Sequence, residues 1–174
     1  MIYVAKSNLI LIGMPASGKS TIGVLLAKRL GKGFVDTDLM IQQREDALLQ
    51  DIVNRCGVSG FLDLEQSVIC SLSCANSVVA PGGSAVCRPD MAIHLKSLGE
   101  LVYLRLPEAT IISRMSNFAT RGIAMEAEET LSDIYQKRTP LYEQYADYTA
   151  DCDGKSAAQI SEEIASIFLQ RKRK

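Results

Sequence analysis

The sequence lacks a long hydrophobic run near its start. The apolar run at residues 9–12, which follows an early Lys6, is only four residues long. A secretory signal core needs about 7–15 apolar residues, and a membrane-spanning helix needs about 20. We therefore expect no signal peptide, no membrane partner and a location in the cytoplasm.

An excess of charge of one sign is also missing. The chain carries 19 Lys and Arg against 20 Asp and Glu, which gives a formal net charge of −1. Such a balance creates no global field that would attract nucleic acid or an acidic membrane. The basic run at residues 171–174 is interpreted as a solvated chain end. We therefore expect no nucleic-acid partner.

Side chains that bind transition metals are few. His94 is the only histidine, and the five cysteines are odd in number and show no C-x-x-C spacing. Cys70 and Cys74 lie on one predicted helix, but a zinc site there would need further ligands. We therefore predict small buried thiols and no zinc site.

Short apolar runs alternate with segments of helical spacing along the whole chain. Strands are predicted at residues 8–12, 33–36, 77–80, 100–106 and 147–150, and helices at 19–30, 39–56, 60–74, 89–98, 126–146 and 156–170, with another helix that begins near Pro107. This alternation predicts an α/β fold with a parallel sheet and helices on both faces. Ligands bind such sheets outside the carboxyl ends of the strands. The length and the absence of a linker favour one domain over residues 1–174.

Residues 13–20 read Gly-Met-Pro-Ala-Ser-Gly-Lys-Ser and match the Walker A pattern G-x-x-x-x-G-K-[ST] at every fixed position. Glycines let the backbone curl until its N–H groups point inward, and the following helix adds its positive end. A lysine reaches the phosphates and a serine hydroxyl binds Mg²⁺. The predicted ATP-binding residues of this P-loop are Gly13, Ala16, Ser17, Gly18, Lys19, Ser20 and Thr21. The motif alone indicates a nucleoside triphosphate and not yet a kinase.

Two acids follow the second predicted strand. Ser20 and Asp36 are the candidate Mg²⁺ ligands, Asp36 directly or through water. Asp38 would bind a substrate hydroxyl and serve as its general base. Its alternative role is to cap the next helix, which is compatible with the first.

Glycines and arginines complete the predicted site. Gly82 and Gly83 follow the third strand, where missing side chains would let a ligand approach the backbone, or would simply allow a tight turn. Arg121 lies in a predicted lid at residues 116–124, and Arg138 lies on the following helix. Arginines poised over a phosphate chain neutralise charge on the transferring group. Lys155 is a further candidate for nucleotide contact, from its position in a late loop.

Together these segments resemble the shikimate kinase family, and the resemblance covers nearly the whole chain. Besides the P-loop, it rests on four segments: Asp36-Thr37-Asp38, Gly57-x-x-x-Phe61-x-x-x-Glu65, Val78-Val-Ala-Pro-Gly82-Gly83-Ser84 and Arg138-x-Pro140-Leu-Tyr142. The resemblance implies a five-stranded, three-layer P-loop fold of nucleoside-monophosphate-kinase type. It also implies ATP and Mg²⁺, a substrate-binding region at about 38–75, a catalytic lid arginine at Arg121 and a substrate-carboxylate contact at Arg138. Catalysis would rest on Lys19, Asp38 and Arg121, and substrate binding on Asp38, Gly82, Gly83 and Arg138.

Three positions depart from the family pattern. Leu62 stands where the family has an arginine that helps hold the carboxylate of shikimate. A charge-assisted hydrogen bond is worth roughly 1.5–3 kcal/mol, so its loss should cost about 10- to 100-fold in affinity. Ser84 replaces the third glycine, and Gly122 and Ile123 replace the usual Pro-Leu of the lid. Either the acceptor is a different small polyol or hydroxy acid, or the protein is a shikimate kinase in which Arg55 or Arg88 supplies the missing charge.

Other classes of P-loop protein fit less well. A GTPase needs an Asn-Lys-x-Asp motif that recognises guanine, and this sequence does not contain one. A nucleotide-binding pseudokinase would bind ATP without transferring phosphate, and the complete P-loop with Asp36 and Asp38 argues against it. A nucleotide kinase would need an acceptor phosphate anchor, which Leu62 removes. We therefore predict a phosphotransferase that is shikimate kinase-like, acts on a small hydroxylated molecule and is a monomer.

Overall fold

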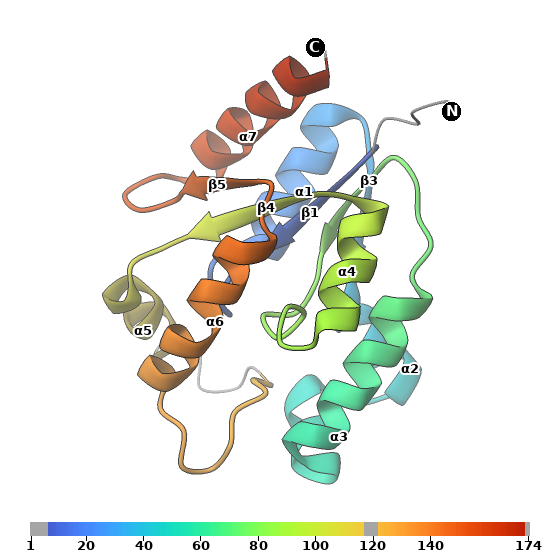
Figure 1. The fold of residues 1–174 in the computed structure, drawn as a ribbon, viewed down its shortest axis with the longest axis vertical. Helices are drawn as coiled ribbons and strands as arrows, with labels where there is room; N and C mark the ends of the chain where they lie inside the picture. The colour runs from blue at the N-terminus through green and yellow to red at the C-terminus, as the bar shows by residue number, and fades with distance from the viewer. Residues whose placement is uncertain (1–6, 117–121, 173–174) are drawn as a thin grey trace.

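Five short strands form one parallel sheet in the computed structural model, which describes residues 7–116 and 122–172. The strands are β1 (Asn8–Ile12), β2 (Gly33–Asp36), β3 (Ser77–Ala80), β4 (Gly99–Arg105) and β5 (Tyr148–Asp151). Their order across the sheet is β2-β3-β1-β4-β5 (Figure 1). The predicted α/β fold with a five-stranded parallel sheet is therefore confirmed.

Strand β1 lies at the centre of the sheet, where it pairs with β3 on one side and with β4 on the other, and all of its residues are buried. Leu9 aligns with Val78 of β3 and with Glu100 of β4. The buried Asn8 amide donates to the carbonyls of Cys74 at 2.8 Å and Leu98 at 3.0 Å, and its Oδ1 accepts from the Ser77 amide at 2.9 Å. This one side chain therefore joins the starts of the three central strands.

Seven helices in the described residues connect and cover the strands. They are α1 (Lys19–Leu30), α2 (Thr37–Glu45), α3 (Leu49–Ser71), α4 (Pro89–Leu98), α5 (Glu108–Ser116), α6 (Leu131–Tyr145) and α7 (Ala157–Lys172). Helices α1 and α7 pack together on one face of the sheet, and α4 and α6 lie on the other (Figure 1). Right-handed crossovers place these helices on opposite faces of the sheet. The connection from β1 to β2 runs across the sheet in one direction, and the connection from β3 to β4 runs in the opposite direction. Among these residues, no helix is both long and apolar enough to cross a membrane.

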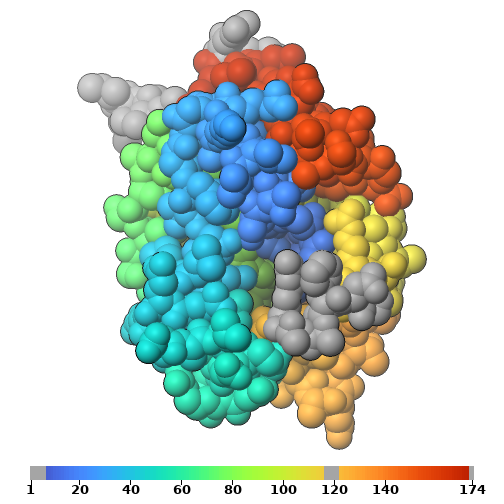
Figure 2. Space-filling view, turned by 180° about the vertical axis from the view of Figure 1, so that it is seen from behind, coloured from blue at the N-terminus to red at the C-terminus, as the bar shows by residue number. Residues whose placement is uncertain are grey.

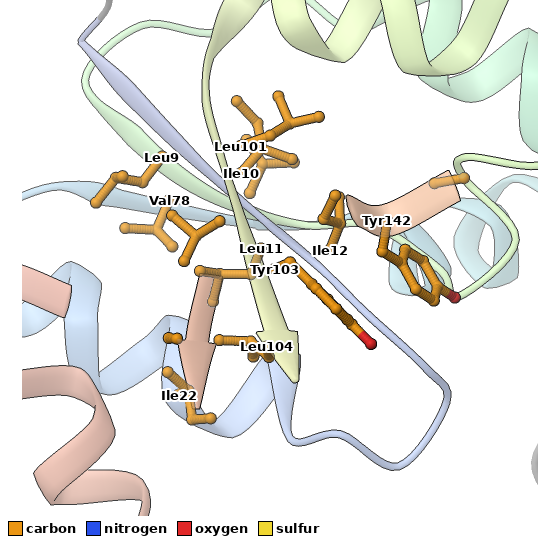
Figure 3. Packing of buried hydrophobic residues seen from close by; sticks show 14 of the residues in the cluster. Leu9, Ile10, Leu11, Ile12, Ile22, Val78, Leu101, Tyr103, Leu104 and Tyr142 are labelled. Atoms are coloured by element: carbon orange, nitrogen blue, oxygen red, sulfur yellow. The ribbon is translucent and has the colours of Figure 1, made fainter. Parts of the chain in front are cut away.

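The main core lies around β1 and β4 and reaches the edge where the P-loop begins (Figure 3). The rings of Tyr103 and Tyr142 stack with centroids 5.1 Å apart. The Tyr142 hydroxyl donates to the carbonyl of Gly83 at 2.5 Å. Burial raises the pKa of Tyr142, so its hydroxyl stays protonated and keeps this bond. The core therefore supports the loop that follows β3.

The helices between β2 and β3 differ from the prediction of 39–56 and 60–74. The chain turns at Asp46, which adopts a left-handed conformation with φ of 47° and ends α2. Gly57, whose φ of 71° and ψ of 177° are not helical, divides α3 into two helical halves, so the predicted break between residues 56 and 60 is confirmed. Buried residues on both sides of the kink, among them Ile52 and Phe61, belong to one apolar cluster. Shared packing therefore holds the two halves of α3 together across the kink.

The predicted helix at 126–146 begins later than expected. Thr130 caps α6: its hydroxyl accepts from the Asp133 amide, and the Asp133 carboxylate accepts from the Thr130 amide. Glu126, Glu128 and Glu129 precede this cap and therefore lie outside α6. A capping box overrides weak helical spacing upstream of it.

All five cysteines are free thiols in the structure. Cys152 is buried, as predicted. Cys56 and Cys70 are exposed on α3, so the prediction of buried thiols was wrong for these two. Helical spacing did not indicate which face of α3 turns toward solvent.

Candidate active site

A cleft of about 850 Å³ opens beside the carboxyl ends of β1, β2 and β3. Its walls come from the P-loop, from α2 and α3, from the Gly82-Gly83 turn and from the residues that precede α6. Figure 2 shows the hollow between the blue start of the chain, the cyan to green α2–α3 region and the orange residues before α6. The cleft lies where a parallel sheet normally binds its ligands.

The P-loop is curled as a phosphate-binding loop requires. Gly18 has a φ of 93°, and Ala16 has a φ of 62°, a region that residues with a Cβ rarely adopt. Such local strain is typical of ligand-binding loops. The Lys19 ammonium donates to the carbonyls of Gly13 and Met14, both at 2.9 Å. Lys19 is therefore folded against the loop, with its charge at the cleft.

The two candidate oxygen ligands for a cation, from Ser20 and Asp36, lie together at the cleft. The Ser20 hydroxyl donates to Asp36 Oδ2 at 2.7 Å. Asp36 Oδ1 accepts from the amides of Asp38 at 3.0 Å and Leu39 at 3.3 Å. Asp36 is thus the cap of α2, so the capping role considered for Asp38 was wrong. A hydroxyl beside a carboxylate is the donor set that Mg²⁺ takes in P-loop proteins.

The Gly82-Gly83 turn has no room for side chains. A Cβ on Gly82 would lie 2.4 Å from Glu65 Oε1 and 2.8 Å from Asp38 Oδ1. A Cβ on Gly83 would lie 2.6 Å from Pro15 Cδ. A side chain at Gly83 would meet the Pro15 ring and backbone, and one at Gly82 would displace two carboxyl groups, so the turn brings the P-loop, Asp38 and Glu65 to one point of the cleft.

Glu65 is the most unusual group in the cleft, because its side chain is 0% exposed. Its Oε2 accepts from the Ser84 hydroxyl at 2.6 Å, while its Oε1 has no hydrogen-bond partner among the described residues. Burial raises its pKa to about 7, and the neighbouring Asp38 carboxylate acts in the same direction. The cleft therefore holds a carboxyl oxygen that lacks a partner.

Two arginines line the cleft from the C-terminal half of the chain. Arg138 on α6 is 7% exposed and donates to the carbonyl of Ala124 at 2.6 Å. Arg114 on α5 donates to the carbonyl of Ala16 at 3.3 Å and so contacts the P-loop. Arg138 thus lies near Asp38 and Glu65, and Arg114 lies beside the P-loop.

Most predicted site residues meet in this cleft. The predicted residues that line it are Ala16, Gly18, Lys19, Ser20, Thr21, Asp36, Asp38, Gly82, Gly83 and Arg138. Gly13 and Ser17 belong to the loop but are not among the described lining residues. Lys155 also lies away from the lining, and its ammonium pairs with Glu163 at 2.6 Å. Arg121, and with it residues 117–121 of the predicted lid, lies outside the described residues.

The apolar part of the lining was not predicted. It includes Leu48 and Leu49 at the start of α3, and Ile123 before α6. Gly122 lies so close to α3 that a Cβ there would be 2.5 Å from the Leu49 carbonyl carbon. This contact leaves no room for a side chain at position 122. Leu48 and Leu49 fit the spacing of the predicted helix at 39–56. That spacing does not indicate whether an apolar side chain lines a cleft or lies in the core.

Leu62 is not among the described lining residues, although its neighbour Phe61 is. It is half-buried against the apolar cluster that contains Phe61 and Ala124. Neither arginine considered as a substitute lines the cleft. Arg55 pairs with Glu45 at 2.6 Å, and Arg88 pairs with Asp63 at 2.6 Å. In the described residues, the acceptor side therefore gains no charge from Arg55 or Arg88.

Comparisons with known proteins agree with this geometry. A family model described as shikimate kinase matches residues 15–168. The shikimate kinase of Paracidovorax citrulli is 36% identical over 161 residues, covering 89% of this chain and 88% of that protein. The shikimate kinase of Syntrophus aciditrophicus is 36% identical over 180 residues, covering 95% and 92%. The solved shikimate kinase from Acinetobacter baumannii, in complex with shikimate, superposes with a TM-score of 0.89 at 31% identity, covering 97% of this chain and 96% of that one.

Proposed function

This chain belongs to the shikimate kinase family and is an ATP-dependent small-molecule kinase, and we propose that the cleft described above transfers the phosphoryl group. One observation carries the proposal: Lys19, the Ser20–Asp36 pair and Asp38 line a single cleft. These are the cation, the metal ligands and the candidate base that phosphoryl transfer to a hydroxyl requires.

The P-loop side binds the nucleotide. Backbone N–H groups near Ala16 and Gly18 would face the phosphates, and Lys19 would exchange its carbonyl partners for phosphate oxygens. Ser20 and Asp36 would hold Mg²⁺. When bound, Mg²⁺ would neutralise charge on the phosphates and orient them. Arg114, already in contact with the loop, would add charge on the same side.

The acceptor hydroxyl binds between Asp38, Gly83 and Arg138. Asp38 orients this hydroxyl and takes its proton as the oxygen forms a bond to the γ-phosphorus. The bond from that phosphorus to the bridging oxygen breaks, leaving ADP and a phosphate ester. Charge on the transferring group would be stabilised by Lys19 and, as a prediction, by Arg121.

Other parts of the proposal extend beyond the cleft. Residues 116–124 would form a lid that limits wasteful hydrolysis of ATP. Lys155 would contact the nucleotide, although its present partner is Glu163. The chain would act as a single domain over 1–174, with the substrate region at about 38–75, as a monomer in the cytoplasm.

The test measures ADP release with Mg-ATP and a panel of alcohols that includes shikimate. We expect saturable release with at least one acceptor. Asp38→Asn should lower kcat by at least about 100-fold, the contribution typical of a general base, while ATP binding stays nearly intact.

Asp63→Asn is the matched control, because Asp63 is exposed on α3 and is not among the described lining residues. It should retain the wild-type kcat. Full activity of Asp38→Asn would contradict the role of Asp38, and ATP binding without release for any acceptor would contradict the proposed function.

A further inference from the structure

Ser84 and Glu65 meet beside the cleft, Ser84 from the turn after β3 and Glu65 from α3. The Ser84 hydroxyl donates to Glu65 Oε2 at 2.6 Å. Both side chains are buried, since 4% of Ser84 and 0% of Glu65 is exposed. Oε1 of Glu65 has no partner among the described residues, so Ser84 supplies the only hydrogen bond that this carboxyl receives from them.

The turn after β3 limits the direction of the Ser84 hydroxyl. The Ala85 amide donates to the Gly82 carbonyl at 3.2 Å, and the Cys87 amide donates to the Ser84 carbonyl at 2.8 Å. These bonds hold the backbone on both sides of Ser84, and burial keeps most water away from its hydroxyl. The hydroxyl is therefore a donor committed to Glu65.

Position 62 is the place on α3 from which another donor can reach Glu65. Residues i and i+3 are neighbours on a helix surface, and Leu62 lies three residues before Glu65 in the second half of α3. Leucine has no donor, and its side chain packs against the apolar cluster that contains Phe61 and Ala124. An arginine there would keep its stem on this cluster and extend its guanidinium toward the carboxyl. With leucine at position 62, the hydrogen bond to Glu65 comes from Ser84 instead.

We propose that Ser84 is a positioning residue of the cleft: its hydroxyl holds the buried Glu65 carboxyl in the place of a donor at position 62. Both positions are among the three that depart from the family pattern, and the proposal couples these two departures to each other. Glu65 in turn lies beside Gly82 and Asp38, because a Cβ on Gly82 would meet the carboxyl oxygens of both acids. Ser84 therefore acts on the acceptor side through Glu65, a role that goes beyond the proposed function.

The charges around Glu65 give this hydrogen bond a pH dependence. Burial raises the pKa of Glu65 to about 7, the Ser84 bond lowers it, and the Asp38 carboxylate on α2 raises it. Arg138 on α6 and Lys19 on α1 act in the same direction as Ser84. Removing the hydroxyl should therefore raise the pKa of Glu65 above this value. The folded state loses stability as the pH rises through the folded pKa, so the loss of Ser84 should cost more at pH 8 than at pH 5.

Urea unfolding at pH 5 and pH 8 tests the proposal in wild type, Ser84→Ala, Leu62→Arg and the double variant. Ser84→Ala should lower the urea midpoint at pH 8 by about 1 M, which is the loss of one hydrogen bond to a charged group divided by a typical urea slope. The midpoint should fall by less at pH 5. In the Leu62→Arg background, the same substitution should cost at most about half as much at pH 8, because the guanidinium supplies the missing donor.

Two control variants separate this role from packing. Ser161 is also fully buried, and its hydroxyl donates to the Ala158 carbonyl at 2.8 Å, so Ser161→Ala should lower the midpoint equally at both pH values. Leu62→Met adds no donor and should leave the cost of Ser84→Ala unchanged. If Leu62→Arg does not fold, Leu62→Gln supplies an uncharged amide donor at the same position and takes its place in the comparison.

The outcomes decide between a hydrogen-bonding role for Ser84 and a packing role. Equal losses for Ser84→Ala at pH 5 and pH 8 would show a packing role and overturn the proposal. An undiminished loss at pH 8 in the Leu62→Arg background, or in its Leu62→Gln substitute, would overturn the coupling between the two positions. All of these measurements report folding and none reports turnover, so a failure here leaves the proposed kinase function intact.

Discussion

Replacing Glu65 by glutamine should remove a pH dependence of folding stability. The ordinary pKa of this carboxyl is 4.5, and burial raises it to about 7 in the folded protein. Between these values the folded state holds a proton that the unfolded state has lost. Stability from this group is therefore fully present below about pH 4.5 and is lost as pH rises through about 7.

The magnitude follows from the two pKa values. One pKa unit corresponds to about 1.4 kcal/mol, so the rise from 4.5 to about 7 corresponds to about 3 kcal/mol in the free energy of unfolding. A domain of this size is stable by only about 5–15 kcal/mol, so the effect is large enough to measure. The Ser84 bond to Oε2 opposes the shift and is included in the value of about 7.

Urea unfolding at several pH values between about 5 and 8 tests this reasoning. The stability difference between wild type and Glu65→Gln should change by about 3 kcal/mol across the range, with the wild type losing more as pH rises. Glu128→Gln, at an exposed glutamate, is the control and should run parallel to the wild type. Parallel curves for Glu65→Gln as well would show that Glu65 is not buried in a protonated form.

Three further predictions follow from named contacts. Lys19→Met should lower the rate of ADP release by at least about 100-fold, because the lost ammonium would stabilise the charge on the phosphoryl group during transfer. The thermal unfolding temperature should change little, and retained turnover would contradict the role of Lys19. Asn8→Ala should destabilise the fold by about 3 kcal/mol in urea, since it leaves buried groups of Ser77, Cys74 and Leu98 without partners, whereas Asn54→Ala at an exposed site should not. Tyr142→Phe should raise KM for the acceptor several-fold and leave KM for ATP unchanged, because the lost bond holds the Gly83 carbonyl at 2.5 Å; equal changes in both constants would indicate a general loss of packing instead.

Local patterns predicted β1, β2 and β3 well because each is short and ends at or just before a glycine, an acid or a proline. The bounds of β1, β2 and β3 agree with the prediction, as do those of α1 and α4. Gly31 ends α1 in a left-handed conformation, and Pro89 begins α4, so both ends carry a chemical marker. Where no such marker existed, as at Asp46, the prediction of 39–56 as one helix failed.

The phosphate side of the site was predictable and the acceptor wall was not. The P-loop is encoded in eight consecutive residues, so its spacing alone identifies Lys19 and Ser20. Leu48, which is 67% exposed at the rim, and Ile123 reach the cleft only through the packing of α3 against the residues before α6. Glu65 was recognised as part of a motif, but its unpaired oxygen depends on Ser84 across the cleft.

The central position of β1 has a consequence for the order of assembly on the ribosome. The first strand to be synthesised pairs with β3 and β4, whose residues begin at Ser77 and Gly99. Gly13 lies against the carbonyl of Leu104, so this contact of the P-loop can form only after the end of β4 has emerged. The nascent chain must therefore carry β1 unpaired at least until β3, which ends at Ala80, has been synthesised. Non-local parallel pairing of this kind folds slowly and exposes strand edges. The P-loop is thus synthesised before the strands that pack against it.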